Sequence, residues 1–382
     1  MTAQPGEPAA LAPERRLKIA VYAICLNEAA FVDRFMDSCR DADLVVVADT
    51  GSSDGTVERL KARGAIVHSI SIKPWRFDHA RQAALDLVPE DVDICVSLDL
   101  DQLLEPGWRR ILEKAWKPES NRVYYSLAWA RNHDGSPRYV LDNRIHARQG
   151  FVWRYPVHEC VLAAEGVVEH ILIIRHLRID HQPDVEKSRG QYLGLLELAA
   201  REEPALPRHA HYLGREYVFL GRHAEALAEF ERQFAMQPGP GGLERNVSLR
   251  LAAQCRDALG EADAALALYR QAAEEAPETR GPLIDLAWAL YQREAWAECY
   301  AVAVRAAALP ELAEVYGAAS DTGVLPEDMA AICGWRLGHF HEALDYGRRA
   351  HRLAPHVDRI RLNLEQMETV MASRRPAGAA PG

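Results

Sequence analysis

The hydrophobic pattern of this chain changes its period near residue 200. Before that point short apolar runs alternate with amphipathic stretches, whereas from about Pro207 the strand-like runs disappear and a helical pattern recurs. A length of 382 residues suits two ordinary domains rather than one. We therefore expect an α/β domain over residues 17–200 and an all-helical domain over residues 201–372.

The α/β domain is predicted to contain a mostly parallel sheet. Strands that alternate with helices along the chain require right-handed crossovers between parallel neighbours. In such sheets ligands bind at the carboxyl ends of the strands. The expected strands are 18–26, 43–48, 66–70 and 93–98, and the expected helices are 28–38, 57–63 and 79–87.

Polar clusters follow three of these strands, so we expect them to meet at one edge of the sheet. Asn27 and Glu28 follow the first strand, 49–56 follows the second, and Asp99 and Asp101 follow the fourth. Two carboxylates so spaced can address different parts of one ligand, such as a divalent cation and a hydroxyl group. A solvated turn is the alternative for the acidic pair, but the buried strand before it favours a ligand.

The segment 49–56 also has a structural explanation as a strand-to-helix connection. Ser53 or Asp54 would cap the helix that follows, and the glycines would allow positive φ angles. This explanation leaves out Asp49, which stands at the strand end, where a base or a ribose could be hydrogen-bonded.

The helical domain contains a repeat of about 34 residues that is interrupted by inserts. Small residues at matching positions let the two helices of a hairpin approach closely, and stacked hairpins leave a concave surface for a partner. The pattern resembles tetratricopeptide repeats, with a generic alanine-rich bundle as the alternative. The matching residues are Gly214, Tyr217, Gly221, Ala226, Phe230 and Pro238, then Ala253, Gly260, Ala265, Tyr269 and Pro277, then Ala287, Leu290, Ala306 and Pro310, then Ala331, Gly338, Ala343, Ala350 and Pro355.

Composition excludes several classes of protein. The 45 Lys and Arg against 55 Asp and Glu give a net charge of −10, which argues against a nucleic-acid binder. The apolar runs are too short for a transmembrane segment. Seven cysteines without a CxxC pair indicate reduced thiols in a cytoplasmic protein. Residues 1–16 are predicted to be a disordered lead rather than a signal peptide, and residues 373–382 a disordered tail.

Five segments of the first domain together resemble the family 2 glycosyltransferases of the GT-A fold. The resemblance covers roughly residues 17–200, and the downstream repeats are similar to those of a subgroup with C-terminal tetratricopeptide repeats. Any one segment would be a weak match, but their order and spacing are specific. The segments are AICLNE (23–28), VVADTGSSDGT (46–56), WRFDHAR (75–81), LDLD (98–101) and YPVHE (155–159).

The resemblance implies transfer of a sugar from a nucleoside diphosphate donor, with inversion at the anomeric carbon. Asp101 would bind a divalent metal, Mn²⁺ or Mg²⁺, and such a cation neutralises the charge that grows on the diphosphate leaving group. Arg81 would lie near the ribose or diphosphate, and Asp99 near the ribose or a metal-bound water. The nucleotide-sugar-binding positions carried over in this way are Ile24, Asn27, Glu28, Asp49, Arg81 and Asp99.

The reaction also requires a base within hydrogen-bond reach of the acceptor. We expect Glu159 in this role, with His158 as the neighbour that positions it or competes with it; a surface His-Glu pair is the alternative. His181 is the candidate to complete the metal shell, although a histidine at a strand end is more often structural.

Two positions depart from the family pattern. The subgroup commonly has Glu where this chain has Gln102, and Asn where it has Gln82. Because Gln102 carries no charge, any base or ligand role of a glutamate is absent there. These departures concern donor selectivity more than the class of reaction.

Aromatic and basic residues later in the domain have two explanations each. Trp129, Trp153 and Tyr155 could stack on a sugar or line an acceptor site, or they could be ordinary core residues. Arg144 and His146 alternate along an expected strand and could share one face, with a solvated edge as the alternative.

The expected partners are a nucleoside diphosphate sugar, most simply a UDP-sugar, and a peptide, protein or glycoconjugate acceptor recruited by the repeats; a homo-oligomer is conceivable. One alternative is a non-catalytic repeat scaffold with a degenerate nucleotide-binding domain, which the joint presence of the acidic and basic site residues disfavours. A nucleotidyltransferase is a second alternative, but the segment 23–28 lacks the glycine-rich basic loop it would need.

Overall fold

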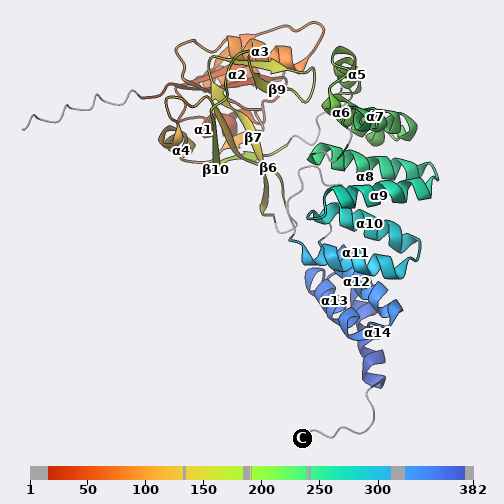
Figure 1. The fold of residues 1–382 in the computed structure, drawn as a ribbon. Coiled ribbons are helices and arrows are strands. Elements are labelled where there is room, and N and C mark those ends of the chain that lie inside the picture. Colours follow the sequence, from red (N-terminus) through yellow and green to blue (C-terminus); the bar gives the residue numbers. More distant parts are fainter. Residues whose placement is uncertain are drawn as a thin grey trace, which may run out of the picture. The chain divides into compact units, whose positions relative to one another are not determined.

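The computed structural model describes residues 16–131, 135–183, 190, 192–237, 239, 242–310 and 323–374. The chain divides into two compact units, Met1–Arg189 and Gly190–Gly382 (Figure 1). Apart from Arg16, Ser373 and Arg374, the expected lead and tail lie outside the described residues, as does Pro238 of the first repeat. Within the described ranges, no helix combines the length and the apolar composition needed to cross a bilayer.

The first unit is built on a sheet whose described strands follow the order β3-β2-β1-β4-β7-β6-β10-β5. Its first half has the predicted alternation of strand and helix, and each pair of neighbouring strands there is parallel. These elements are β1 (Ile19–Cys25), α1 (Val32–Ser38), β2 (Leu44–Asp49), α2 (Thr56–Ala62), β3 (Ile66–Ser69), α3 (Phe77–Asp86) and β4 (Ile94–Ser97).

The other half of the sheet makes it mixed, so the prediction of a mostly parallel sheet is wrong there. Strand β7 runs antiparallel to both β4 and β6, and β10 is parallel to β6 but antiparallel to β5. Only a few residues separate β6 from β7, and a short connection permits an antiparallel hairpin but no crossover. The elements are β5 (Gln102–Leu104), α4 (Trp108–Ala115), β6 (Arg122–Arg131), β7 (Pro137–Ala147) and β10 (Ile171–His181).

Both faces of the sheet are covered, because alternate residues of the central strands point to opposite sides. Val21 of β1 lies in a core with Phe35 of α1, whereas Tyr22 lies in a second core with Ala84 of α3 and Trp153. Trp153 belongs to a separate two-stranded ribbon, β8 (Phe151–Arg154) and β9 (Cys160–Ala163). The loop between these two strands contains the expected base.

The second unit is a stack of helix hairpins, as the sequence repeat predicts (Figure 1). Helices pack in the pairs α6–α7, α8–α9, α10–α11 and α12–α13, and α14 packs on α13. The helices are α5 (Tyr192–Glu202), α6 (Pro207–Phe219), α7 (His223–Met236), α8 (Leu243–Ala258), α9 (Ala262–Glu275), α10 (Arg280–Gln292), α11 (Trp296–Ala308), α12 (Leu325–Leu337), α13 (Phe340–Leu353) and α14 (Asp358–Ser373).

The small residues of the repeat have the predicted packing role. A Cβ atom at Gly214 of α6 would lie 2.5 Å from the Phe230 ring of α7, and this ring is fully buried. Buried ion pairs join successive hairpins: Arg250 Nε of α8 lies 2.5 Å from Asp285 Oδ2 of α10. Close contact within a hairpin and charge pairing between hairpins therefore hold the stack together.

Gly214→Ala is expected to destabilise the helical unit by about 1–3 kcal/mol, because the added methyl group overpacks a site whose neighbour cannot move. Gly194→Ala, in α5, is the matched control: its Cβ would meet nothing within 4 Å, so the change should stabilise by about 0.5–1 kcal/mol. Urea unfolding of both variants measures the difference. A Gly214→Ala variant as stable as the unchanged chain would contradict this packing.

Candidate functional site

Asp49 fixes the start of the loop that follows β2. Its buried carboxylate accepts hydrogen bonds from the backbone N–H groups of Gly51 at 3.1 Å and Ser52 at 3.0 Å. Hydrogen bonds of this type stabilise the turn and orient the backbone at the strand end. Asp49 thus has a structural role that the sequence alone left unexplained.

The loops after β1 and β2 are tied to each other. Asn27, in the left-handed region at φ 53°, accepts the N–H of Ser53 at 2.8 Å on its side-chain oxygen. The Glu28 N–H donates to Thr56 Oγ1 at 2.8 Å, and the Glu28 side chain is buried. The structure therefore brings Asn27, Glu28 and Asp49 to one edge of the sheet, with half-buried Ile24 just before them on β1.

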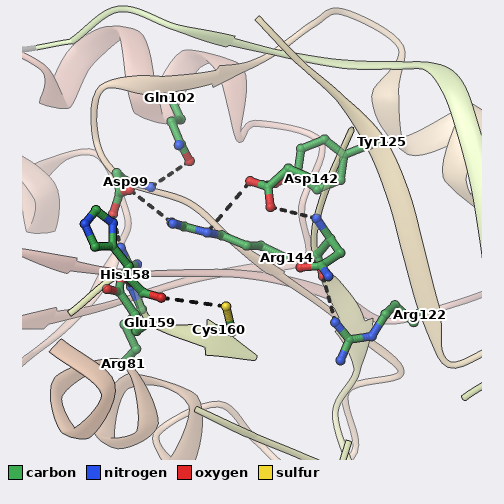
Figure 2. Close-up of polar contacts among 11 residues, drawn as sticks. Arg81, Asp99, Gln102, Arg122, Tyr125, Asp142, Arg144, His158, Glu159 and Cys160 are labelled. Carbon is green, nitrogen blue, oxygen red and sulfur yellow. Dashed lines mark hydrogen bonds and ion pairs between the residues drawn. The ribbon is translucent and has the colours of Figure 1, made fainter. Parts of the chain in front are cut away.

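Arg81, on α3, is a buried residue in a cluster of charged side chains (Figure 2). Its Nη2 donates to Asp99 Oδ1 at 2.7 Å and its Nε donates to Glu159 Oε1 at 2.5 Å. Burial alone would lower the pKa of the guanidinium, but the charges of Asp99 and Glu159 outweigh it and raise the pKa. The cluster joins three residues that the sequence assigned separately to the donor and to the base.

Arg144, on β7, also belongs to this cluster, although the sequence predicts for it only a face shared with His146. Its Nη1 lies 3.1 Å from Asp99 Oδ2, so the two arginines grip the two oxygens of one carboxylate (Figure 2). Burial opposes its charge, but Asp99 and Asp142 raise the pKa of Arg144. Its alternation with His146 was the available signal, and a solvated edge is the wrong explanation for a side chain in this cluster.

One donor of the cluster has no partner. Arg81 Nη1 is buried and makes no hydrogen bond in the described part of the chain. A buried cationic donor left unsatisfied is costly, so such a group usually meets a ligand or a water. An anionic ligand at this edge would satisfy it.

The β8–β9 loop presents Glu159 and His158. Tyr155 at φ 79° and His158 at φ 50° both lie in the left-handed region of backbone conformation, which residues other than glycine rarely adopt. Backbone conformations of this kind gather at functional sites. The Pro156 carbonyl accepts the N–H of Phe77 at 2.9 Å, which ties the loop to α3. With a side chain only 8% exposed, Glu159 is not part of a surface His-Glu pair.

Asp101 and His181 meet because of the pairing of β5 with β10. His181 is opposite Gln102 in the antiparallel register, which places its ring beside the residue before β5. His181 Nε2 lies 3.5 Å from Asp101 Oδ2. In the described residues, Asp101 Oδ1 and His181 Nδ1 are both buried without a hydrogen-bond partner. The pair therefore has unused capacity for a ligand.

The two glutamines that depart from the family pattern, Gln82 and Gln102, stabilise the backbone around the charged cluster. Gln102 accepts the N–H of Asp99 at 3.2 Å and so holds the turn between the two acidic residues. Gln82 accepts the N–H of Trp153 at 3.0 Å, which ties β8 to α3. Both side chains thus accept hydrogen bonds from backbone N–H groups near the cluster.

The Trp153 ring packs against the guanidinium groups of Arg81 and Arg144. The Arg81 and Arg144 guanidinium carbons lie 5.2 Å and 5.9 Å from its ring centre, within cation–π range. Its Nε1–H donates to Tyr22 Oη at 2.9 Å, and Tyr22 in turn lies 2.9 Å from His146 Nε2. Since His146 Nδ1 lies 2.8 Å from a carbonyl oxygen, Nδ1 carries the proton and Nε2 accepts from Tyr22.

This network predicts a dependence of stability on pH. Burial lowers the pKa of His146 from 6.5 to about 4. Below pH 6.5 His146 is protonated in the unfolded chain but stays neutral in the folded chain. The free energy of unfolding therefore falls as the pH drops toward 4. Between pH 7.5 and 5 this position should cost about 2 kcal/mol. His146→Gln removes the titrating group but keeps a hydrogen-bond acceptor. Urea unfolding should therefore show that the difference in unfolding free energy between the unchanged chain and this variant shrinks by about 2 kcal/mol from pH 7.5 to pH 5. A difference that stays constant over this pH range would contradict the prediction.

The cation that the resemblance implies has a limited set of ligands. In the part of the chain that the structure describes, no group of three or more His, Cys, Asp and Glu side chains is arranged to hold a metal ion. Asp101 and His181 nevertheless offer a carboxylate and an imidazole close enough for one cation, and each has an unpartnered buried atom. Two protein ligands suit Mg²⁺ or Mn²⁺ ions that complete their shells with phosphate oxygens and water.

Solved structures of TPR proteins are similar to this chain at low identity. YrrB, described as a TPR protein with an unusual peptide-binding site, has a TM-score of 0.37 at 12% identity, covering 46% of this chain and 83% of YrrB. A MamA structure, AMB-1, has a TM-score of 0.35 at 20% identity, covering 44% of this chain and 90% of MamA. TTC0263, a thermophilic TPR protein of Thermus thermophilus, has a TM-score of 0.32 at 20% identity, covering 47% of this chain and 92% of TTC0263.

Comparison with families and curated proteins gives one sequence relationship. No family model matches the chain. The lipopolysaccharide core biosynthesis glycosyltransferase LpsC of Rhizobium meliloti (strain 1021) is 25% identical over 155 residues, which cover 34% of this chain and 56% of LpsC. The chain thus spans about half the length of the curated relative it matches. Over about a third of its own length, the chain is similar to a glycosyltransferase.

Proposed function

We propose that the first unit is an inverting, metal-dependent glycosyltransferase of the family 2 type with a GT-A fold. The observation that carries the proposal is the contact of the buried Arg81 with Asp99 and Glu159, next to the pair of Asp101 and His181. The similarity to LpsC supports a glycosyltransferase, and the parallel half of the sheet supports a nucleotide at its carboxyl edge. A nucleoside diphosphate sugar, with UDP as the first choice, is the proposed donor.

The donor's nucleoside is proposed to lie at the edge formed by β1 and β2. Asn27, Glu28 and Asp49 tie the loops there to each other, and Ile24 offers an apolar side chain beside them. Rigid loops around a base or ribose reduce the entropy that binding must overcome. Arg81 would meet the diphosphate, which gives its unpartnered Nη1 an acceptor.

Asp101 and His181 are the residues that would hold the Mn²⁺ or Mg²⁺ ion. Their nearest donor atoms are 3.5 Å apart, a separation at which both can contact one cation. When bound, the ion would neutralise the negative charge that develops on the diphosphate as it leaves. Gln102 keeps Asp101 in place by holding the preceding turn.

Glu159 is the proposed base, and His158 is its neighbour on the strained loop. A carboxylate here would take the proton from the acceptor hydroxyl as that oxygen attacks the anomeric carbon. Arg81 holds one oxygen of Glu159 and thereby fixes the orientation of the carboxylate. Glu159→Gln should therefore bind nucleotide within about threefold of the unchanged chain and lose at least about 100-fold in transfer rate. Full turnover by Glu159→Gln would assign the base elsewhere.

The helical unit is proposed to recruit the acceptor. Stacked hairpins present an extended concave surface, which suits a peptide, a protein or a glycoconjugate. We include self-association through this unit in the proposal, since most oligomers of soluble proteins are built from copies of one chain. The alternative, a repeat scaffold with a degenerate nucleotide-binding unit, would bind nucleotide without turnover.

Calorimetry of the intact chain with UDP, GDP and TDP tests the proposal. Binding of at least one nucleotide that is stronger by about tenfold or more with Mn²⁺ than with a chelator is expected, because the cation bridges protein and phosphate. The same titration with the nucleoside alone is the control for the diphosphate. If none of the three nucleotides shows metal-dependent binding, the proposed glycosyltransferase activity is rejected.

A further inference from the structure

Strand β6 is irregular next to the pair of Asp101 and His181. Ala128 pairs with Tyr139 of β7 and Ala130 pairs with Arg138, so two steps along β6 match one step along β7. Trp129 is the extra residue of this β-bulge. Bulges bend a strand and turn a side chain to a new direction, and they are common beside active sites.

The neighbouring strand on the other side places Trp129 beside His181. Asp180 of β10 pairs with Ala128 of β6 in a parallel register. The residues that follow them, His181 and Trp129, are therefore neighbours. The two ring centres are 5.5 Å apart and the rings are inclined by 28°, a stacked arrangement. His181 thus supports the indole from one side, while the Trp129 side chain remains 54% exposed.

An apolar platform and unsatisfied polar atoms therefore lie side by side at this edge. Trp129 offers a rigid exposed ring. The proposed cation lies between His181 Nε2 and Asp101 Oδ2, which leaves Asp101 Oδ1 and His181 Nδ1 without partners in the described residues. Binding sites typically combine apolar surface with a few convergent polar groups. A ligand that suits this place has a flat apolar face and hydroxyl groups around it.

The order of strands separates this platform from the proposed nucleoside end. Asp49 stands at the end of β2 and Asn27 just after β1, whereas Trp129 lies on β6, with β4 and β7 between them. Asp99, which follows β4, lies between the two ends and belongs to the charged cluster. A donor whose nucleoside occupies the first end leaves Trp129 for the other reactant.

We infer that Trp129 is the platform on which a pyranose ring of a saccharide acceptor stacks. The inference rests on the proposed function and narrows its acceptor from peptide, protein or glycoconjugate to a molecule that presents a sugar ring. One face of a pyranose carries C–H groups that pack on an indole, and its hydroxyl groups point outward to polar partners. Trp129 gives affinity for the acceptor and takes no part in proton transfer.

The test measures pyranoside binding to the intact chain in the presence of UDP and Mn²⁺. Saturation-transfer NMR with methyl α- and β-pyranosides of glucose, galactose, mannose and N-acetylglucosamine should show binding of at least one to the unchanged chain. Trp129→Ala should weaken it by about tenfold or more, and Trp129→Phe should restore part of the loss. Trp288→Ala is the matched control, since Trp288 is 48% exposed and stacked on Tyr291 but belongs to the second unit.

UDP affinity measured on the same samples separates the two claims. It should stay within about threefold in all variants, because Trp129 itself binds neither nucleotide nor cation in this proposal and the pairing of β10 with β5 holds His181 in place. Absence of Mn²⁺-dependent UDP binding by the unchanged chain would reject the proposed function itself. With UDP bound, any of three results would overturn the assignment of Trp129: no pyranoside binds, Trp129→Ala binds pyranoside as well as the unchanged chain does, or UDP affinity falls together with pyranoside affinity.

Discussion

Asp101→Asn is expected to weaken Mn²⁺-dependent nucleotide binding by at least about 100-fold, because the neutral amide removes the one proposed carboxylate ligand of the cation. The substitution keeps the shape of a buried side chain, so the fold should persist. Affinity in the presence of a chelator should change little. Calorimetry with UDP and with Mn²⁺ or a chelator measures both quantities.

Asp180→Asn is the matched control for this effect. Asp180 precedes His181 on β10, but its two oxygens are taken by Arg131 at 2.5 Å and Gln182 at 2.8 Å. Its replacement should change UDP affinity by less than about threefold, since it removes the same negative charge as Asp101→Asn but does not contact the proposed cation. Equal losses in both variants, or retained metal dependence in Asp101→Asn, would contradict the assignment of the metal to Asp101.

Arg81→Leu is expected to lower both stability and activity. The substitution leaves Glu159 buried without its cation, and breaking a buried ion pair costs about 3–5 kcal/mol. The same guanidinium is paired with Asp99, so the substitution should also disorder the proposed donor site. Sugar transfer should therefore fall below detection. Urea unfolding and a nucleotide-release assay measure the two effects.

The double variant Arg81→Leu with Glu159→Leu distinguishes charge burial from general damage. Replacing both members of a buried pair by apolar residues is often neutral or stabilising, so most of the lost stability should return while activity stays absent. Arg144→Gln is the milder comparison, since it leaves the contact between Arg81 and Glu159 intact. If the double variant is no more stable than Arg81→Leu alone, the cluster is not held by this charge pair.

The parallel half of the sheet could be predicted because its signals are local. Each apolar run ends at a polar turn, and the strand ends of such a sheet must share an edge. The sequence predicts on this ground that Asn27, Glu28 and Asp49 share one edge, and the structure brings them there. What the sequence could not show is that the Asp49 carboxylate binds the N–H groups of its own loop.

The mixed half depends on pairings between distant segments, which no local pattern encodes. Arg144 lies 45 residues after Asp99 and reaches it only because β7 pairs with β4. His181 meets Asp101 through the register of β10 against β5, and it meets Trp129 through the register against β6. The sequence singles out each of these residues, but their contacts depend on strand order and register.

The anomeric configuration of the first sugar released tests the central claim most directly. The intact chain is incubated with Mn²⁺ and an α-linked UDP-, GDP- or TDP-hexose, and proton NMR follows the product before it mutarotates. Attack by water from the face opposite the diphosphate must give the β-sugar together with free nucleoside diphosphate. Early appearance of the α-sugar, or no release of nucleoside diphosphate from any donor, would contradict an inverting glycosyltransferase.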